Sequence, residues 1–270
     1  MVVYFRKMNN LFMLIGGIVG ATAGYLVFKG KIFGDGNIIN IFLFAMFLAA
    51  GIIIGRTAAA FTANKKLQEI YRILYRDADP KRFIDSFTPL LETVPKNLAE
   101  YMTGCQHLSF AREALGEFEE AYDLIKDLKP EELRLHALTT TSLITNQKAN
   151  LCVLMEDKES VRALISDLAS LRESASKRAP MLANNLSECI KLHNTRLDAM
   201  EGSPDTDTGY LEEEIRVSTN VIHQKEIQLE LARFLRGQGQ AEHAKELLQE
   251  ILSDCRGLYT EDKAQELLAS

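Results

Sequence analysis

The chain has 270 residues, of which 47% are hydrophobic and 25% are charged, and its formal net charge is −6. Residues 1–66 contain seven basic residues and one acidic residue, so they carry +6 and leave −12 for residues 67–270. An acidic domain argues against nucleic acid as a partner, because phosphates require a basic surface. The four cysteines are far apart and form no CxxC pair, which argues against a disulfide framework or a zinc site.

Two apolar segments near the N-terminus predict transmembrane helices. Residues 11–28 contain no charge, and residues 38–55 are equally apolar and can extend to residue 61. A helix of 18 residues is about 27 Å long, which is close to the hydrocarbon thickness of a bilayer. Helix is the form expected in lipid, because backbone groups cannot stay unpaired there. We therefore predict a transmembrane hairpin with spans at about 11–28 and 38–61, through which the protein contacts membrane lipids.

The basic residues around the two spans predict their orientation. The short connection contains Lys29 and Lys31, whereas the other side of the membrane carries more basic residues. These are Arg6, Lys7, Lys65, Lys66, Arg72 and Arg76, with Arg56 at the edge. The positive-inside rule then places both termini in the cytoplasm of an integral membrane protein, with a bacterial plasma membrane as the expected location. A cleaved signal peptide is the alternative interpretation of the first span, with Ala21-Thr22-Ala23 as its cleavage site.

Small residues predict where helices pack inside the membrane. Glycines recur at every fourth position of the first span and again in the second span: Gly16, Gly20, Gly24, Gly51 and Gly55. This spacing puts them on one helix face, where another helix can approach closely. The pattern resembles a glycine zipper. We expect the two spans of one chain to pack on each other, and the alternative is a homo-oligomer assembled through the same faces.

From residue 64 onward the composition is that of a soluble, all-helical domain, so we divide the chain into an anchor at 1–63 and a domain at 64–270. No long stretch alternates with period two, which argues against a sheet. Asp79-Pro80 and Lys129-Pro130 are typical of helix starts. We expect helix pairs at 64–93, 97–129, 132–174, 180–219 and 222–254, followed by a short helix from Thr260 to Ala269.

The clearest internal unit lies between Lys225 and Leu252, with a turn around Gly237 and Gly239. Apolar residues recur at spacings of three and four on both sides of this turn, as expected of two amphipathic helices. They are Leu231, Ala232 and Leu235 in the first helix, and Ala241, Ala244, Leu248, Ile251 and Leu252 in the second. Such a pair cannot bury both apolar faces alone, so it must stack on similar pairs.

At these residues the chain resembles the tetratricopeptide repeat (TPR) family. Leu231-Ala232, Gly239 and Ala244 match the family's adjacent large and small residues, turn glycine and early alanine. Earlier copies contain Leu108, Gly116, Phe118, Ala121, Ile125 and Leu128, then Ala149, Cys152, Val161, Ile165 and Leu168 without a turn glycine. The chain departs from the family in lacking tryptophan, and its copies do not recur at the usual spacing of about 34 residues.

The resemblance implies a diverged TPR-like α-solenoid over roughly residues 64–254, whose first helices line a concave groove for a protein or peptide partner. Carrying the inward-facing positions of the family onto two copies selects Asn146 and Asn150, then Arg233 and Arg236. Asparagine can bind a peptide backbone, and arginine can hold a carboxylate in bidentate fashion. Alternatively, all four are ordinary exposed helix residues.

Motifs that carry chemistry are missing from the sequence. There is no HExxH, GxxxxGK[ST], GxGxxG or GxSxG motif, so we predict no catalytic residue, metal ligand or cofactor. The expected function is that of a membrane-anchored scaffold or adaptor that binds a protein. Two alternatives stay open: a structural membrane oligomer capped by the helical domain, and a membrane enzyme with an unrecognised site.

Overall fold

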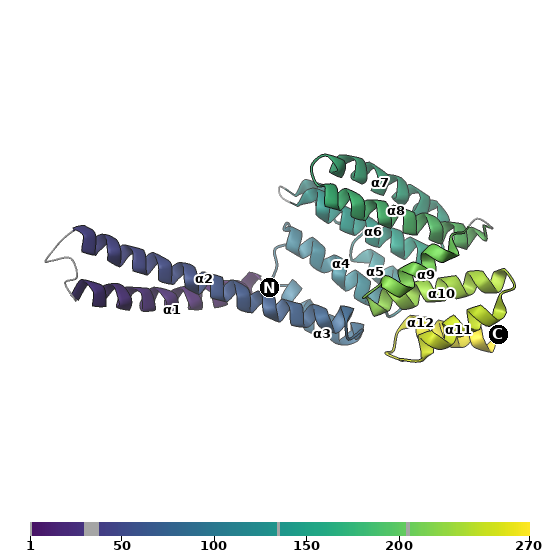
Figure 1. Ribbon diagram of the computed structural model, residues 1–270, viewed down its shortest axis with the longest axis horizontal. Helices are drawn as coiled ribbons and strands as arrows, with labels where there is room; N and C mark the ends of the chain where they lie inside the picture. Colours follow the sequence, from purple (N-terminus) through teal and green to yellow (C-terminus); the bar gives the residue numbers. More distant parts are fainter. Residues whose placement is uncertain (1, 30–37, 134–135, 204–205) are drawn as a thin grey trace. The chain divides into compact units, whose positions relative to one another are not determined.

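The computed structural model describes residues 2–29, 38–133, 136–203 and 206–270 (Figure 1). Within these ranges every regular element is a helix and no strand occurs. The prediction of an all-helical chain is therefore confirmed. The chain divides into two compact units, which are described separately: residues 1–70 with 92–94, and residues 71–91 with 95–270.

The first unit contains helix α1 (Val2–Lys29) and most of helix α2 (Ile38–Tyr75). Each contains a stretch that is long and apolar enough to cross a membrane, and only 11% of either stretch is buried. The predicted spans lie within these two helices, and the connection at residues 30–37 lies outside the described residues. Helix α2 continues without a break past residue 63, where the sequence predicted the boundary between anchor and domain.

Glycines lie at the contact between α1 and α2. A Cβ atom added to Gly16 would be 2.1 Å from the carbonyl oxygen of Gly51, and one added to Gly55 would be 2.2 Å from that of Phe12. A Cβ atom on Gly20 would be 2.4 Å from the carbonyl oxygen of Phe47, and one on Gly24 would be 2.8 Å from the Phe44 ring. Because these separations are shorter than any real Cβ contact, the two backbones can pack this closely only where side chains are absent.

The second unit begins with the last turn of α2 and the helices that follow it. They are α3 (Pro80–Leu91), α4 (Ala99–Glu113), α5 (Phe118–Asp123), α6 (Ala137–Leu154), α7 (Lys158–Ser176), α8 (Pro180–Glu201), α9 (Thr208–Val217), α10 (Val221–Gly237), α11 (Ala241–Leu252) and α12 (Tyr259–Ala269). Pro80 starts a helix as predicted. Pro130 starts only a single 3₁₀ turn, Pro130–Glu132, because Leu133 is already extended.

Helices that follow one another in this unit pack together. α6 lies between α4 and α7, α7 packs on α8, and α10 contacts α8, α9, α11 and α12 (Figure 1). Fully buried leucines such as Leu151, Leu168 and Leu231 fill the contacts, as the helical spacing of apolar residues requires. At the beginning of the unit, stacked aromatic rings of Tyr71, Phe83 and Phe87 form part of the core.

Four of the turns that end a helix have the same backbone geometry. Gly116, Glu156, Gly202 and Gly239 all have a positive φ, between 60° and 79°. In each turn, the amide of the following residue donates to the carbonyl oxygen five positions earlier: Glu117 to Arg112, Asp157 to Cys152, Ser203 to Asp198, and Gln240 to Leu235, at 2.9–3.0 Å. This is the hydrogen bond of a Schellman cap, which satisfies a free carbonyl at a helix C-terminus.

The end of the second unit contacts its beginning. The Tyr259 amide donates to the Ala114 carbonyl oxygen at 3.1 Å, and the Tyr259 ring packs edge-on against Phe118 with 5.0 Å between centroids. Arg256 Nη1 donates to the carbonyl oxygen of Asp77 at 2.6 Å. Segments up to 179 residues apart in the sequence are therefore joined.

Candidate functional site

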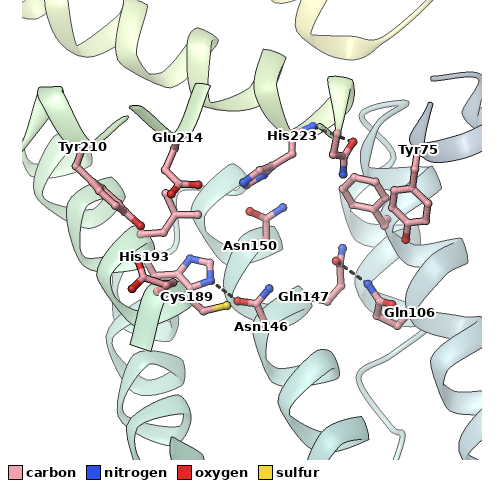
Figure 2. Close-up of a pocket in the computed structure, with 14 residues that line it drawn as sticks. Tyr75, Gln106, Asn146, Gln147, Asn150, Cys189, His193, Tyr210, Glu214 and His223 are labelled. Carbon is pink, nitrogen blue, oxygen red and sulfur yellow. Dashed lines mark hydrogen bonds between the residues drawn. The ribbon is translucent and has the colours of Figure 1, made fainter. Parts of the chain in front are cut away.

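A pocket of about 330 Å³ opens between helices of the second unit, and Figure 2 shows its lining residues. The lining comes from the end of α2, from α4, α6, α8 and α9, and from the start of α10. Tyr210 and Glu214 lie on one side, Tyr75 and Gln106 on the other, and the amide side chains of α6 lie between them (Figure 2). We call this space the central pocket.

Asn146 and His193 form one wall of the central pocket. Asn146 Oδ1 accepts a hydrogen bond from His193 Nε2 at 3.0 Å. Burial, with the charges of Arg196 and His223, lowers the pKa of His193 to about 3, so the ring is neutral at physiological pH. A neutral ring that carries its proton on Nε2 has an acceptor at Nδ1. Among the described residues, this buried Nδ1 has no hydrogen-bond partner.

The floor of the pocket is formed by the Gln147 and Asn150 amides, which hold a buried carboxyl group. Glu113 is fully buried, and its two oxygens accept hydrogen bonds from Gln147 Nε2 and Asn150 Nδ2, each at 2.6 Å. Burial and the nearby charge of Glu226 raise the pKa of Glu113 well above its ordinary value. Neither oxygen of the buried Glu226 has a hydrogen-bond partner among the described residues. Because two carboxylates close together in the interior repel each other, the protonated form of Glu113 is favoured.

Arg196 continues this network on the other side of Asn150. Its guanidinium is 1% exposed, donates Nη1–H to Asn150 Oδ1, and donates from Nε and Nη2 to the two oxygens of Glu230 at 2.7 and 2.5 Å. Asn150 is thereby connected to Glu113 and Arg196 at once. The Asn150 oxygen and one N–H of its amide are therefore used inside the protein, and a ligand would mainly meet the residues above the floor.

A second pocket, of about 590 Å³, is lined by residues from α6, α7, α8 and α10 and from the turns that end them. Arg196 and Glu230 contribute to it, together with Lys158 and the exposed Arg233. Arg236 lines neither pocket: it donates to the carbonyl oxygen of Leu267 and to Ser270 Oγ, so it holds the end of α12.

The structure thus distributes the four predicted groove residues over three environments. Asn146 and Asn150 line the central pocket together, although Asn150 is buried and engaged in the floor. Arg233 lines the second pocket, and Arg236 binds the C-terminal helix of its own chain. The two arginines therefore do not join the two asparagines at one site.

Sequence reasoning missed Glu113, His193 and Arg196. One signal could have found Arg196: it lies six residues before Gly202, just as Asn150 lies six residues before Glu156 and Arg233 six before Gly239. The predicted helix pair at 180–219 contains this turn, but the TPR resemblance was not extended to it, because a polar insertion follows Gly202. The burial of Glu113 has no local signal, since exposed glutamates surround it in the sequence.

Among the described residues, no group of three or more histidine, cysteine, aspartate or glutamate side chains could hold a metal ion. The four cysteines are free, and one of them, Cys189, lines the central pocket. The chemistry that this pocket offers is hydrogen bonding and charge. No known family model, curated protein or solved structure matches the chain.

Proposed function

We propose that the chain is a membrane-anchored adaptor whose TPR-like helical domain binds a segment of a protein or peptide partner in the central pocket. The observation that carries this proposal is the origin of the pocket lining. The end of α2 and helices α4, α6, α8 and α10 are the first helices of the predicted pairs, and all of them contribute to one pocket, to which the second helix α9 adds Tyr210 and Glu214. In a solenoid, the first helices form the concave surface on which a partner lies.

The exposed apolar surface of α1 and α2 supports a membrane anchor. Large side chains such as Leu14 and Ile54 are 62% and 68% exposed, although a soluble protein seldom leaves so much apolar surface in contact with water. Both helices therefore cross the bilayer as a hairpin, with the basic flanks and both termini in the cytoplasm. The setting we propose is a bacterial plasma membrane.

The matching turns support a repeat. Gly116, Glu156 and Gly239 end the first helix of the three copies that resemble the TPR pattern, and each makes the same capping hydrogen bonds. Five residues after each turn, Ala121, Val161 and Ala244 are fully buried. Glu156 stands where the other two copies have glycine. Duplication of one helix pair would produce the same backbone geometry at the same position of each copy.

The contact between α1 and α2 also bears on the alternative of an oligomer assembled through glycine faces. Gly16 and Gly51 face each other within one chain, so these glycine faces are not available for contact with a second chain. This favours an adaptor over an assembly that needs the glycines for self-association.

The test is photo-crosslinking of the full-length protein in intact membranes, followed by identification of the attached proteins. Asn146→Ala removes a side chain from the wall of the central pocket, and Asn184→Ala, at an exposed position of α8 outside the pocket, is the matched control. We expect a recurring soluble partner with the unchanged protein and with the control, and its loss with Asn146→Ala. Melting curves must show that both variants are folded.

Two outcomes would refute the proposal. One is a partner that is captured equally by all three proteins, because its binding would then not involve the pocket. The other is a set of crosslinks between copies of this chain alone, which would favour the structural oligomer.

A further inference from the structure

We infer that the central pocket binds a cationic side chain, a lysine or an arginine, presented by the bound protein segment. This inference rests on the proposed function and adds the chemical class of the partner. Three independent features of the pocket lead to it: the charges of its lining residues, the hydrogen-bonding groups that are left free, and its aromatic walls.

The carboxylates in the pocket lining carry negative charge. Glu188 and Glu214 line the pocket, and no lysine or arginine does. Glu214 projects toward the same space as His193 and Asn150 (Figure 2). The soluble part of the chain is itself strongly acidic, so its long-range field attracts cations. An anionic side chain in this pocket would meet two carboxylates and no partner of opposite charge.

The pocket contains groups that can only accept hydrogen bonds. These are the carboxylates of Glu188 and Glu214, which line it. One N–H of each of the Gln147 and Asn150 amides is already used by Glu113, and the Tyr75 hydroxyl is bonded to His107 Nδ1 at 2.6 Å. An ammonium or guanidinium group has several N–H donors and no acceptor, so it is the complement of these acceptors.

His193 provides the deepest of these acceptors. Its Nε2 is bonded to Asn146, and its Nδ1 is buried, unpaired among the described residues, and part of a ring that lines the pocket. A buried acceptor without a donor is unfavourable, because the group has lost its hydrogen bonds to water. A ligand N–H group satisfies it, whereas a carboxylate cannot. The Asn146 amide nitrogen stays available for a backbone carbonyl of the same segment.

Aromatic rings complete the site. Tyr75, Phe110 and Tyr210 line the pocket, and the faces of aromatic rings attract cations. One such contact already exists beside the pocket, where Lys191 Nζ lies 3.8 Å from the centre of the Tyr210 ring. Burial, with the charges of Glu214 and Glu188, raises the pKa of Tyr210. The wall at Tyr210 is therefore suited to a positive charge.

The experiment measures peptide binding to the full-length protein in nanodiscs of phosphatidylcholine, a lipid without net charge. The probes are three acetylated, amidated pentapeptides that differ only in the central residue: lysine, ε-acetyl-lysine or glutamate. We expect the lysine peptide to bind at least about tenfold more tightly than the other two. Spermidine is titrated beside them, to separate a peptide side chain from a free amine.

Two matched variants test the site itself. Glu188→Gln with Glu214→Gln removes both carboxylates from the pocket, and Glu173→Gln with Glu212→Gln removes the same charge from exposed positions outside it. We expect the first variant to weaken binding of the lysine peptide by about tenfold or more and the control to leave it within about twofold. Equal loss in both variants would mean a general charge effect and would overturn the inference.

The remaining outcomes distinguish this inference from the proposed function. Tighter binding of the glutamate peptide, or of spermidine, overturns the assignment of a cationic side chain. If Asn146→Ala abolishes capture of the partner in membranes and the Glu188→Gln, Glu214→Gln variant does not, the adaptor function stands and the inference is wrong. If neither variant affects capture, both are wrong.

Discussion

Arg196 and Glu230 form a bidentate ion pair in the interior of the helical domain, with Arg196 Nε and Nη2 at 2.7 and 2.5 Å from the two carboxylate oxygens. The guanidinium also donates to Asn150, which in turn binds Glu113. Three glutamates, Glu113, Glu226 and Glu230, lie near the Arg196 guanidinium, and Glu230 is the one that forms the ion pair with it. This arrangement has consequences for stability and for its dependence on pH.

Replacing Arg196 by methionine should destabilise the domain by about 3–5 kcal/mol, because it leaves a buried carboxylate without its partner. Urea unfolding of the full-length protein in detergent, followed by circular dichroism, measures this loss. The double variant Arg196→Met, Glu230→Leu removes both charges and should recover part of it. A single variant as stable as the unchanged protein would show that the ion pair contributes nothing.

Glu113→Gln should change how stability depends on pH. The pKa of Glu113 is raised in the folded protein by burial and by Glu226, so the folded state binds a proton that the unfolded state releases. The stability linked to Glu113 is therefore complete below pH ~4.5 and is lost as the pH rises toward the folded pKa, by up to about 1.4 kcal/mol per pH unit. Relative to Glu113→Gln, the unchanged protein should lose stability over that window.

The buried histidines act in the opposite direction and must be separated from this effect. Burial lowers the pKa of His107 to about 4, and that of His193 is about 3. Their contribution is present above pH ~6.5 and is lost as the pH falls through the folded pKa values. Since both histidines are present in both proteins, the difference between the two stability curves isolates Glu113. Parallel curves from pH 5 to pH 8 would contradict the prediction.

The turn at Glu156 should tolerate glycine better than a helix does. Glu156 has φ of +60°, a conformation that favours glycine, whereas Ala163 is an exposed residue inside α7. Ala163→Gly should cost about 1 kcal/mol, and Glu156→Gly should be neutral or stabilising. Conversely, Gly239→Ala should cost about 1 kcal/mol through backbone strain alone, since no atom lies within 4 Å of the added Cβ. Thermal melts of the three variants provide the comparison.

In the first unit, two adjacent glycines should respond very differently to substitution. A Cβ on Gly16 would be 2.1 Å from the backbone of Gly51, whereas one on Gly17 would be 3.6 Å from the Ile52 side chain, an ordinary contact. Gly16→Ala should therefore weaken the packing of α1 on α2 by about 1–3 kcal/mol, and Gly17→Ala should have little effect. Denaturation in mixed micelles with increasing dodecyl sulfate measures this difference. Equal midpoints would show that the glycines do not form the contact.

Much of the helical architecture could be predicted because it depends on local patterns. The spacing of Leu231 and Leu235 indicates a helix face, Pro80 marks a helix start, and Gly239 marks a helix end, each within a few residues. The apolar lengths of α1 and α2 were equally visible. The resemblance to the TPR family, and not local periodicity, selected Asn146 as a groove residue, and this side chain lines the central pocket.

The sequence by itself therefore determined which segments are helical, where most of them begin and end, and which two could enter a membrane. Only the tertiary structure decided that Glu113 is buried, that Arg196 neutralises Glu230, and that Arg236 holds the C-terminal helix. Those contacts join residues 31 to 37 positions apart, on different helices. Whether a charged residue faces water or another charge depends on which helices pack together, and local periodicity does not specify that pairing.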